Sequence, residues 1–255
     1  RSYCGRVMMS KLTPEDVVLR YSKRGMNILK KYLKDGYCRT AAEKLLHAER
    51  GTVLLTTGFY VAGYAETDGP LGTVAVAEAL NHLGFHSVVV TDKYCKGFFE
   101  LKQLDVEYVD IAADEQVYEA ILDKYHPVYM ISIERCGENA EHEYANMRGV
   151  SITSETAAID HLFELAPEKH IPTIGVGDGG NEIGMGNVKD IISEKLELNP
   201  CVVPVDDLII ATTSNWGAYA LTAWLQKLSG EEVLFTFAEA EPYLAATLEI
   251  GSVDG

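Results

Sequence analysis

Basic residues are scarce in this 255-residue sequence. Lys and Arg together number 22 against 38 Asp and Glu, which gives a formal net charge of −16. Because nucleic-acid backbones are negatively charged, this imbalance predicts no nucleic-acid partner. The sequence also has no apolar run near the roughly 20 residues of a membrane-spanning helix, so we expect no membrane partner.

Cysteine is scarce as well, with five residues far apart in the sequence, at positions 4, 38, 95, 136 and 201. The count is odd and no CxxC pair occurs, which argues against a disulfide-stapled fold and a structural zinc site. A reducing compartment fits this usage best. No motif implies an organic cofactor.

Apolar residues, at 47%, are plentiful enough for a buried core. From residue 53 onward, short runs rich in β-branched residues alternate with helix-period segments. This alternation predicts an α/β fold with a Rossmann-like, mainly parallel sheet and helices on both faces. The expected strands are 53–57, 87–91, 106–111, 128–133, 173–176 and 208–212, and the expected helices are 71–83, 114–125, 156–166, 216–228 and 238–250.

Residues 1–51 form an N-terminal helical segment that we expect to pack on the α/β domain of residues 52–255. Thr13 is a candidate N-cap, and the apolar stripe of residues 17–33 predicts one helix that Gly36 ends. A capping box at 40–43 predicts a second helix, closed by Gly51. The basic cluster within residues 23–34 is interpreted as the solvated face of the first helix.

Glycines, carboxylates and amides gather after the expected strands, where parallel sheets bind their ligands. The loop 177–187 is the richest, with five glycines among its first ten residues. Its N–H groups are predicted to form an anion-binding nest, and Asp178 and Glu182 to act in catalysis and to bind a metal, expected to be Mg²⁺. An alternative is that these acids only cap helix N-termini. Gly179, Gly180 and Asn181 of this loop are candidate substrate-binding residues.

The loop after the first expected strand contains Glu66 and Asp68, and Gly69 to Gly72 then open a helix. Backbone N–H groups at a helix N-terminus attract a carboxylate or a phosphate. The predicted substrate-binding residues of this segment are Glu66, Asp68, Gly69 and Gly72. Asp92 lies 20 residues after Gly72, near the position of the ribose-binding acid in Rossmann folds, although acids are common at strand ends.

The loop after the fourth expected strand begins with Glu134, a candidate general base or metal ligand. Arg135 or Arg148 is predicted to hold a substrate carboxylate through paired hydrogen bonds. The alternative is that Glu134 and Arg135 form structural ion pairs. Cys136 lacks a placed histidine that would activate it. The other candidate substrate-binding residues at this edge of the sheet are Glu138, Asn139, Ser214 and Asn215, of which Ser214 is also a natural N-cap.

Four of these segments, taken in order, resemble the C-terminal domain of the mitochondrial D-glutamate cyclase family. They are residues 57–72, 134–139, 177–187 and 214–219. The resemblance implies a hydro-lyase that converts D-glutamate into 5-oxo-D-proline and water in the mitochondrial matrix. It also implies an N-terminal domain of the same full-length protein as a partner.

Two functions therefore stand side by side. In the first, this chain is an enzyme domain that acts on D-glutamate, a small carboxylate. In the second, it is a non-catalytic domain that binds a ligand or nucleotide and supports a catalytic N-terminal domain. Assembly of the chain into a homo-oligomer is left open.

Overall fold

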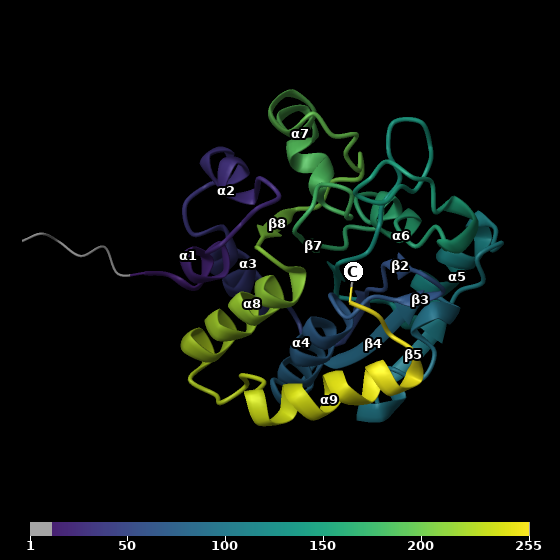
Figure 1. The fold of residues 1–255 in the computed structure, drawn as a ribbon. Coiled ribbons are helices and arrows are strands. Elements are labelled where there is room, and N and C mark those ends of the chain that lie inside the picture. The colour runs from purple at the N-terminus through teal and green to yellow at the C-terminus, as the bar shows by residue number, and fades with distance from the viewer. Residues whose placement is uncertain (1–11, 255) are drawn as a thin grey trace, which may run out of the picture.

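A parallel six-stranded sheet forms the centre of the computed structural model, which describes residues 12–254 (Figure 1). Its strand order is β5-β4-β1-β6-β7-β8, and all neighbouring strands are parallel. The strand order therefore reverses between β1 and β6, and in such sheets ligands bind beyond the carboxyl ends of the strands at this reversal. The strands are β1 (Thr52–Thr56), β4 (His86–Thr91), β5 (Asp105–Tyr108), β6 (Tyr129–Ile133), β7 (Thr173–Gly177) and β8 (Asp207–Ile210), with a separate hairpin of β2 (Tyr60–Val61) and β3 (Tyr64–Ala65).

Helices cover both faces of the sheet, as the sequence predicts (Figure 1). The side chains of β1 alternate between two cores, since Val53 and Leu55 pack in one and Leu54 packs in the other. The first core takes buried residues from α3 (Tyr37–His47), α4 (Pro70–His82), α8 (Ser214–Ser229) and α9 (Phe237–Ile250). The second takes them from α2 (Met26–Leu29), α5 (Glu115–Tyr125), α6 (His161–Leu165) and α7 (Lys189–Leu196). Single 3₁₀ turns are η1 (Lys30–Tyr32), η2 (Lys93–Cys95), η3 (Glu100–Lys102), η4 (Thr153–Glu155) and η5 (Met185–Val188).

The N-terminal segment departs from the expected single helix over residues 17–33. Thr13 does cap a helix, but this helix, α1 (Pro14–Val18), has only five residues. The chain then turns through left-handed conformations at Tyr21 (φ 66°) and Gly25 (φ 86°) before α2 begins. The left-handed backbone favours glycine there, and a Cβ would also lie 2.3 Å from the end of the Leu196 side chain, which would have to move. This glycine overrides the helical period of the apolar residues.

Two other helices also differ from the sequence prediction in where they begin and end. The helix expected from a capping box at Thr40 begins earlier, at Tyr37 with Gly36 as its N-cap, and it ends at His47 rather than at Gly51. The helix expected over residues 156–166 shortens to α6, His161–Leu165. For α3, the chain does not use the predicted cap signals at Thr40 and Gly51 as its helix ends. For α6, the apolar period extends beyond the residues that make helical hydrogen bonds.

Specific hydrogen bonds attach α1 and the following loop to the α/β core. The Thr212 backbone N–H donates to the Val18 carbonyl (2.8 Å), and the Thr212 hydroxyl donates to the Arg20 carbonyl (2.7 Å). The indole of Trp224 donates to the buried Glu15 carboxylate at 2.9 Å. These contacts hold the α1–α2 loop beside the carboxyl ends of β7 and β8.

Two composition-based expectations can be checked within residues 12–254. In this part of the chain no helix combines the length and the hydrophobicity needed to cross a bilayer. Four cysteines are free and buried, namely Cys38, Cys95, Cys136 and Cys201, while Cys4 lies outside the described residues.

Candidate functional site

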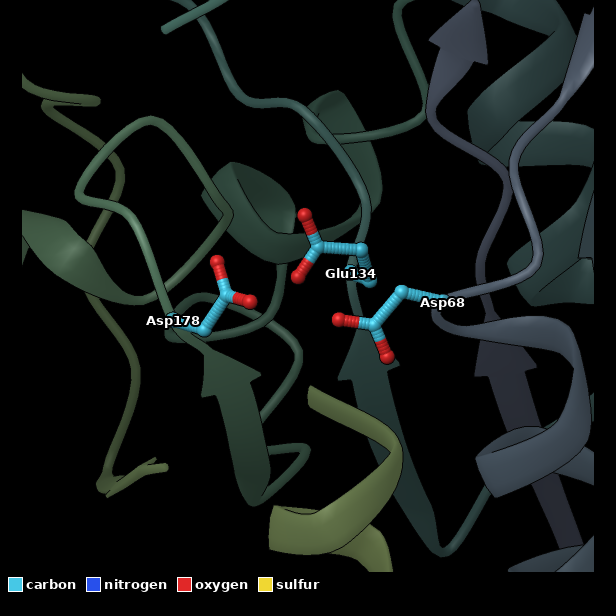
Figure 2. Close-up of side chains that lie close together, drawn as sticks. All are labelled: Asp68, Glu134 and Asp178. Atoms are coloured by element: carbon cyan, nitrogen blue, oxygen red, sulfur yellow. The ribbon is translucent and has the colours of Figure 1, made fainter. Parts of the chain in front are cut away.

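Three carboxyl groups meet at the edge of the sheet where the strand order reverses. They belong to Asp68, Glu134 and Asp178, which we call the acid cluster, and they offer one oxygen each such that these oxygens all lie within 4.8 Å of one another. Figure 2 shows the three side chains converging, with Glu134 just beyond β6 and Asp178 just beyond β7. Sequence reasoning named all three residues but did not foresee that they form one group.

Glu134 is fixed in an uncommon backbone conformation. Its φ is +51°, a left-handed value that costs free energy in a residue other than glycine and that concentrates at functional sites. Its backbone N–H donates to the Val176 carbonyl at 3.1 Å, which ties it to β7. Its carboxylate accepts a hydrogen bond from the buried Ser214 hydroxyl. Gly69 (φ 104°) allows the start of α4 to lie against Glu134, since a Cβ there would come 2.8 Å from the Glu134 Cβ.

Asp68 caps helix α8, and α8 in turn caps α4. The Asp68 carboxylate accepts the backbone N–H groups of Ser214 (2.9 Å) and Asn215 (2.7 Å). The Asn215 amide oxygen accepts the N–H groups of Gly69 (3.0 Å) and Gly72 (2.7 Å). The N–H groups predicted to attract a substrate anion at the start of α4 are therefore already paired with a side chain of the same protein.

The glycine loop after β7 is filled in the same way. The fully buried Glu182 carboxylate accepts the backbone N–H groups of Asp178 (2.9 Å), Gly179 (2.6 Å) and Gly180 (2.7 Å). The nest exists, but its anion is Glu182, which favours the sequence alternative of an acid that caps backbone N–H groups. Gly175, Gly177 and Gly180 do have GxGxxG spacing, which sequence reasoning overlooked, yet this carboxylate occupies the N–H groups that a phosphate would use.

The buried, closely spaced acids of the site have raised pKa values. Burial, together with the negative charges of Glu182 and Asp68, raises the pKa of Asp178 to about 9. Burial and the neighbouring Asp68 raise the pKa of Glu66 to about 8. Burial and Asp178 raise the pKa of Glu134 well above its ordinary value. The pKa of Asp68 is also raised by burial, although the N–H groups of α8 oppose the shift. The site therefore retains protons at neutral pH.

Arg24 is the functional candidate that sequence reasoning missed. Its Nη1 lies 2.8 Å from the Asp178 Oδ1, and its side chain is 47% exposed while that of Asp178 is 3% exposed. The guanidinium thus lies between solvent and the buried acids. The sequence pattern around Lys23 and Arg24 predicts a solvated helix face, and the contact of Arg24 with Asp178 contradicts this prediction for Arg24. The one signal against that prediction is Gly25, which interrupts the helix directly after Arg24.

Arg135 points away from the acid cluster. Its fully buried guanidinium pairs with Asp92 at 2.6 Å and donates to the carbonyls of Gly58 (2.9 Å) and Ala157 (2.6 Å). This arrangement favours the structural ion pair over a substrate anchor, and it also engages the Asp92 carboxylate that was considered for a ribose. Burial raises the pKa of the adjacent Cys136 thiol, which disfavours a nucleophilic thiolate.

Most of the remaining predicted residues line a hollow beside the glycine loop. This hollow of about 410 Å³ is lined by Asn139, Arg148, Gly179, Gly180 and Asn181, among others. Arg148 is exposed there, and the Asn181 amide donates to the Ala145 carbonyl at 2.8 Å. The Glu138 carboxylate instead contacts His142 (3.2 Å).

The comparisons with known proteins agree with the motifs. The family model for D-glutamate cyclase-like, C-terminal proteins matches residues 15–255. The chain belongs to this family. It is 33% identical over 233 residues to human mitochondrial D-glutamate cyclase, an alignment that covers 80% of this chain and 36% of the human protein. This member of the D-glutamate cyclase-like, C-terminal family thus spans about a third of the length of that relative.

Similar solved structures share little sequence with this family member. An exopolyphosphatase-related protein from Bacteroides fragilis is 8% identical, with a TM-score of 0.42 over 84% of this chain and 49% of that one. The Bordetella bronchiseptica enzyme WbmG in complex with NAD is 14% identical, with a TM-score of 0.35 over 71% and 51% of the two chains. Likenesses this weak carry no functional argument.

Proposed function

We propose that this chain is a lyase that converts D-glutamate into 5-oxo-D-proline and water at the acid cluster. The observation that supports this most is the set of three converging carboxyl groups, whose pKa values are all raised by burial and, for Glu134 and Asp178, also by the charges of neighbouring carboxylates. Such a set can hold a proton donor and a proton acceptor side by side at neutral pH. Membership of the D-glutamate cyclase-like family supports the choice of substrate. The human relative is mitochondrial, and we propose the same location for this protein.

The reaction needs proton transfer in two directions. A bond forms between the amine nitrogen and the γ-carboxyl carbon, and one γ oxygen leaves as water. Across the reaction the ammonium gives up two protons and the leaving oxygen receives two, so the net charge of the substrate is unchanged. Asp178, with a pKa of about 9, is protonated near neutral pH and is the assigned donor to the γ-carboxylate. Glu134, held by the Ser214 hydroxyl and protonated because burial raises its pKa, is assigned the second proton of the leaving oxygen, and the two carboxylates so formed take up the two protons of the ammonium.

A Mg²⁺ ion is a second means of neutralising the γ-carboxylate. The three carboxylates of the acid cluster suit a hard cation, because each offers an oxygen within 4.8 Å of the others. The sequence predicts Asp178 and Glu182 as metal ligands, but the Glu182 carboxylate is paired with three N–H groups. The metal-binding set that we propose therefore consists of Asp178, Asp68 and Glu134. When bound, the ion would polarise the γ-carboxyl group. Loss of turnover in chelator that Mg²⁺ restores supports this set, whereas an unchanged rate removes the metal from the proposal.

A non-catalytic role is the alternative, because the chain covers 36% of the human relative and the chemistry could belong to another part of it. The test is to incubate the purified chain with D-glutamate or L-glutamate and to follow 5-oxoproline by chiral chromatography. D-selective product above the uncatalysed rate supports the enzyme. A folded chain that yields none supports the non-catalytic role.

A further inference from the structure

The acid cluster presents a problem for any anionic substrate. Glu66, Glu182 and the acid cluster place five carboxyl groups around one site in a protein of net charge −16. An amino-dicarboxylate would be repelled unless a local cation or a set of N–H donors held its carboxylate. Finding this anchor is therefore central to the proposed function, on which the following inference rests.

Three sets of backbone donors at the site are already used. Asp68 accepts the N–H groups at the start of α8, the Asn215 amide accepts those at the start of α4, and Glu182 accepts those of the glycine loop. Arg135 is not accessible either, because its guanidinium is fully buried against Asp92 and two carbonyls, and the one donor left unpaired, Nε, is itself buried. These donors stabilise the protein itself and leave a substrate carboxylate to be held by another group.

Arg24 has the required position and the required free edge. Its Nη1 contacts Asp178, which places the half-exposed guanidinium between solvent and the acid cluster. Among residues 12–254, the hydrogen bonds of its side chain involve Nη1 alone. The edge formed by Nε and Nη2 is therefore available, and this edge matches the two oxygens of a carboxylate. Arg24 can therefore donate hydrogen bonds to a second carboxylate while it keeps its ion pair with Asp178.

The loop that carries Arg24 is built to hold this position. Thr212 ties the carbonyls of Val18 and Arg20 to the core, and Gly25 packs without a side chain against Leu196. A residue fixed in this way can orient a ligand as well as attract it. We infer that Arg24 is the specificity residue that binds the α-carboxylate of the substrate and turns its amine and γ-carboxyl groups toward the acid cluster.

The test uses a pair of ligands that differ only in this carboxylate. 5-Oxo-D-proline has it and 2-pyrrolidinone lacks it, so equilibrium binding by calorimetry reads the anchor without relying on turnover. For Arg24→Ala we expect the Kd of 5-oxo-D-proline to rise about 10- to 100-fold, the range for a charged hydrogen-bonded pair, with the affinity for 2-pyrrolidinone unchanged. Arg24→Lys should fall between, because it keeps the charge but loses the planar edge.

Lys23→Ala is the matched control, since Lys23 is an exposed cation next in sequence. It should bind both ligands as the unsubstituted protein does. In turnover assays Arg24→Ala should raise KM for D-glutamate. Equal affinity of Arg24→Ala and unsubstituted protein for 5-oxo-D-proline would overturn the inference, as would a loss shared equally by Lys23→Ala. Absence of turnover with normal Arg24-dependent binding would instead refute the proposed reaction while leaving the anchor in place.

Discussion

Asp178 and Glu182 lie four residues apart on one loop, and the structure predicts opposite effects on stability when each is replaced by its amide. Asp178 contacts other carboxyl groups and a half-exposed arginine, so Asp178→Asn removes an unfavourable buried acid. Glu182 accepts three backbone N–H groups. Glu182→Gln must turn an NH₂ group toward at least one of these donors.

The magnitudes follow from protonation and from hydrogen bonding. Holding Asp178 protonated at pH 7, against its ordinary pKa of 3.8, costs about 4 kcal/mol at most, and Asp178→Asn should recover about 1–4 kcal/mol of it. The Arg24 pair that is lost is half-exposed and contributes little. Leaving one buried N–H of the Glu182 set unpaired and weakening the other two should cost about 2–4 kcal/mol.

The pH dependence of the free energy of unfolding is a second test of the predicted gain in stability for Asp178→Asn. The folded-state pKa of Asp178 lies above its ordinary value. Below about pH 3.8 the carboxyl is protonated in both the folded and the unfolded state, and it does not lower the free energy of unfolding. As the pH rises from there toward about 9, the carboxyl lowers the free energy of unfolding progressively. The advantage of Asp178→Asn should therefore grow by at most about 1.4 kcal/mol for each pH unit over this window.

Urea unfolding at pH 5 and pH 8, in chelator so that no cation neutralises the site, measures these free energies. Asp123→Asn is the control, because Asp123 is a 74% exposed acid. It should change stability by less than about 0.5 kcal/mol at either pH. A destabilised Asp178→Asn, or a Glu182→Gln variant as stable as the unsubstituted protein, would refute the division between a functional acid and a loop-capping acid.

Two further predictions concern the groups that frame the site. Asn215→Ala, which removes the acceptor for Gly69 and Gly72, should lower the free energy of unfolding by about 2 kcal/mol in thermal or urea denaturation, and an unchanged value would mean that water replaces the cap. Arg135→Met, which leaves the buried Asp92 carboxylate unpaired, should cost about 3–5 kcal/mol, and the double variant with Asp92→Asn should recover part of the loss. A double variant no more stable than the single one would contradict the structural ion pair.

The strands and the edge that holds the site follow from local pattern. In a sequence that alternates between strand-like and helical segments, apolar β-branched runs are stable as buried strands of a central sheet. All six expected strands form, although their ends differ from the predicted ones. The acids that follow these runs must then gather at one edge of the sheet. Asp68, Glu134 and Asp178 were found on this ground.

The roles of individual side chains could not be read in the same way. Whether the Glu182 oxygens meet a ligand or the N–H groups of their own loop depends on how the loop folds back. Arg24 lies more than a hundred residues before Glu134 and Asp178 in sequence, on a segment with a helical period. Only the turn at Gly25 and the tie to Thr212 bring it to the site. Long-range contacts of this kind leave no periodic signal.

The most direct test of the central claim compares turnover by the unsubstituted chain, Asp178→Asn and Asp123→Asn with D-glutamate as substrate. Chiral chromatography of 5-oxoproline, with the fold of each variant verified by unfolding, gives the rates. The account predicts D-selective product from the unsubstituted chain and Asp123→Asn, and a rate at least about 100-fold lower from a stable Asp178→Asn, the lower range for removing an acid–base group. Equal rates from all three would contradict catalysis at the acid cluster.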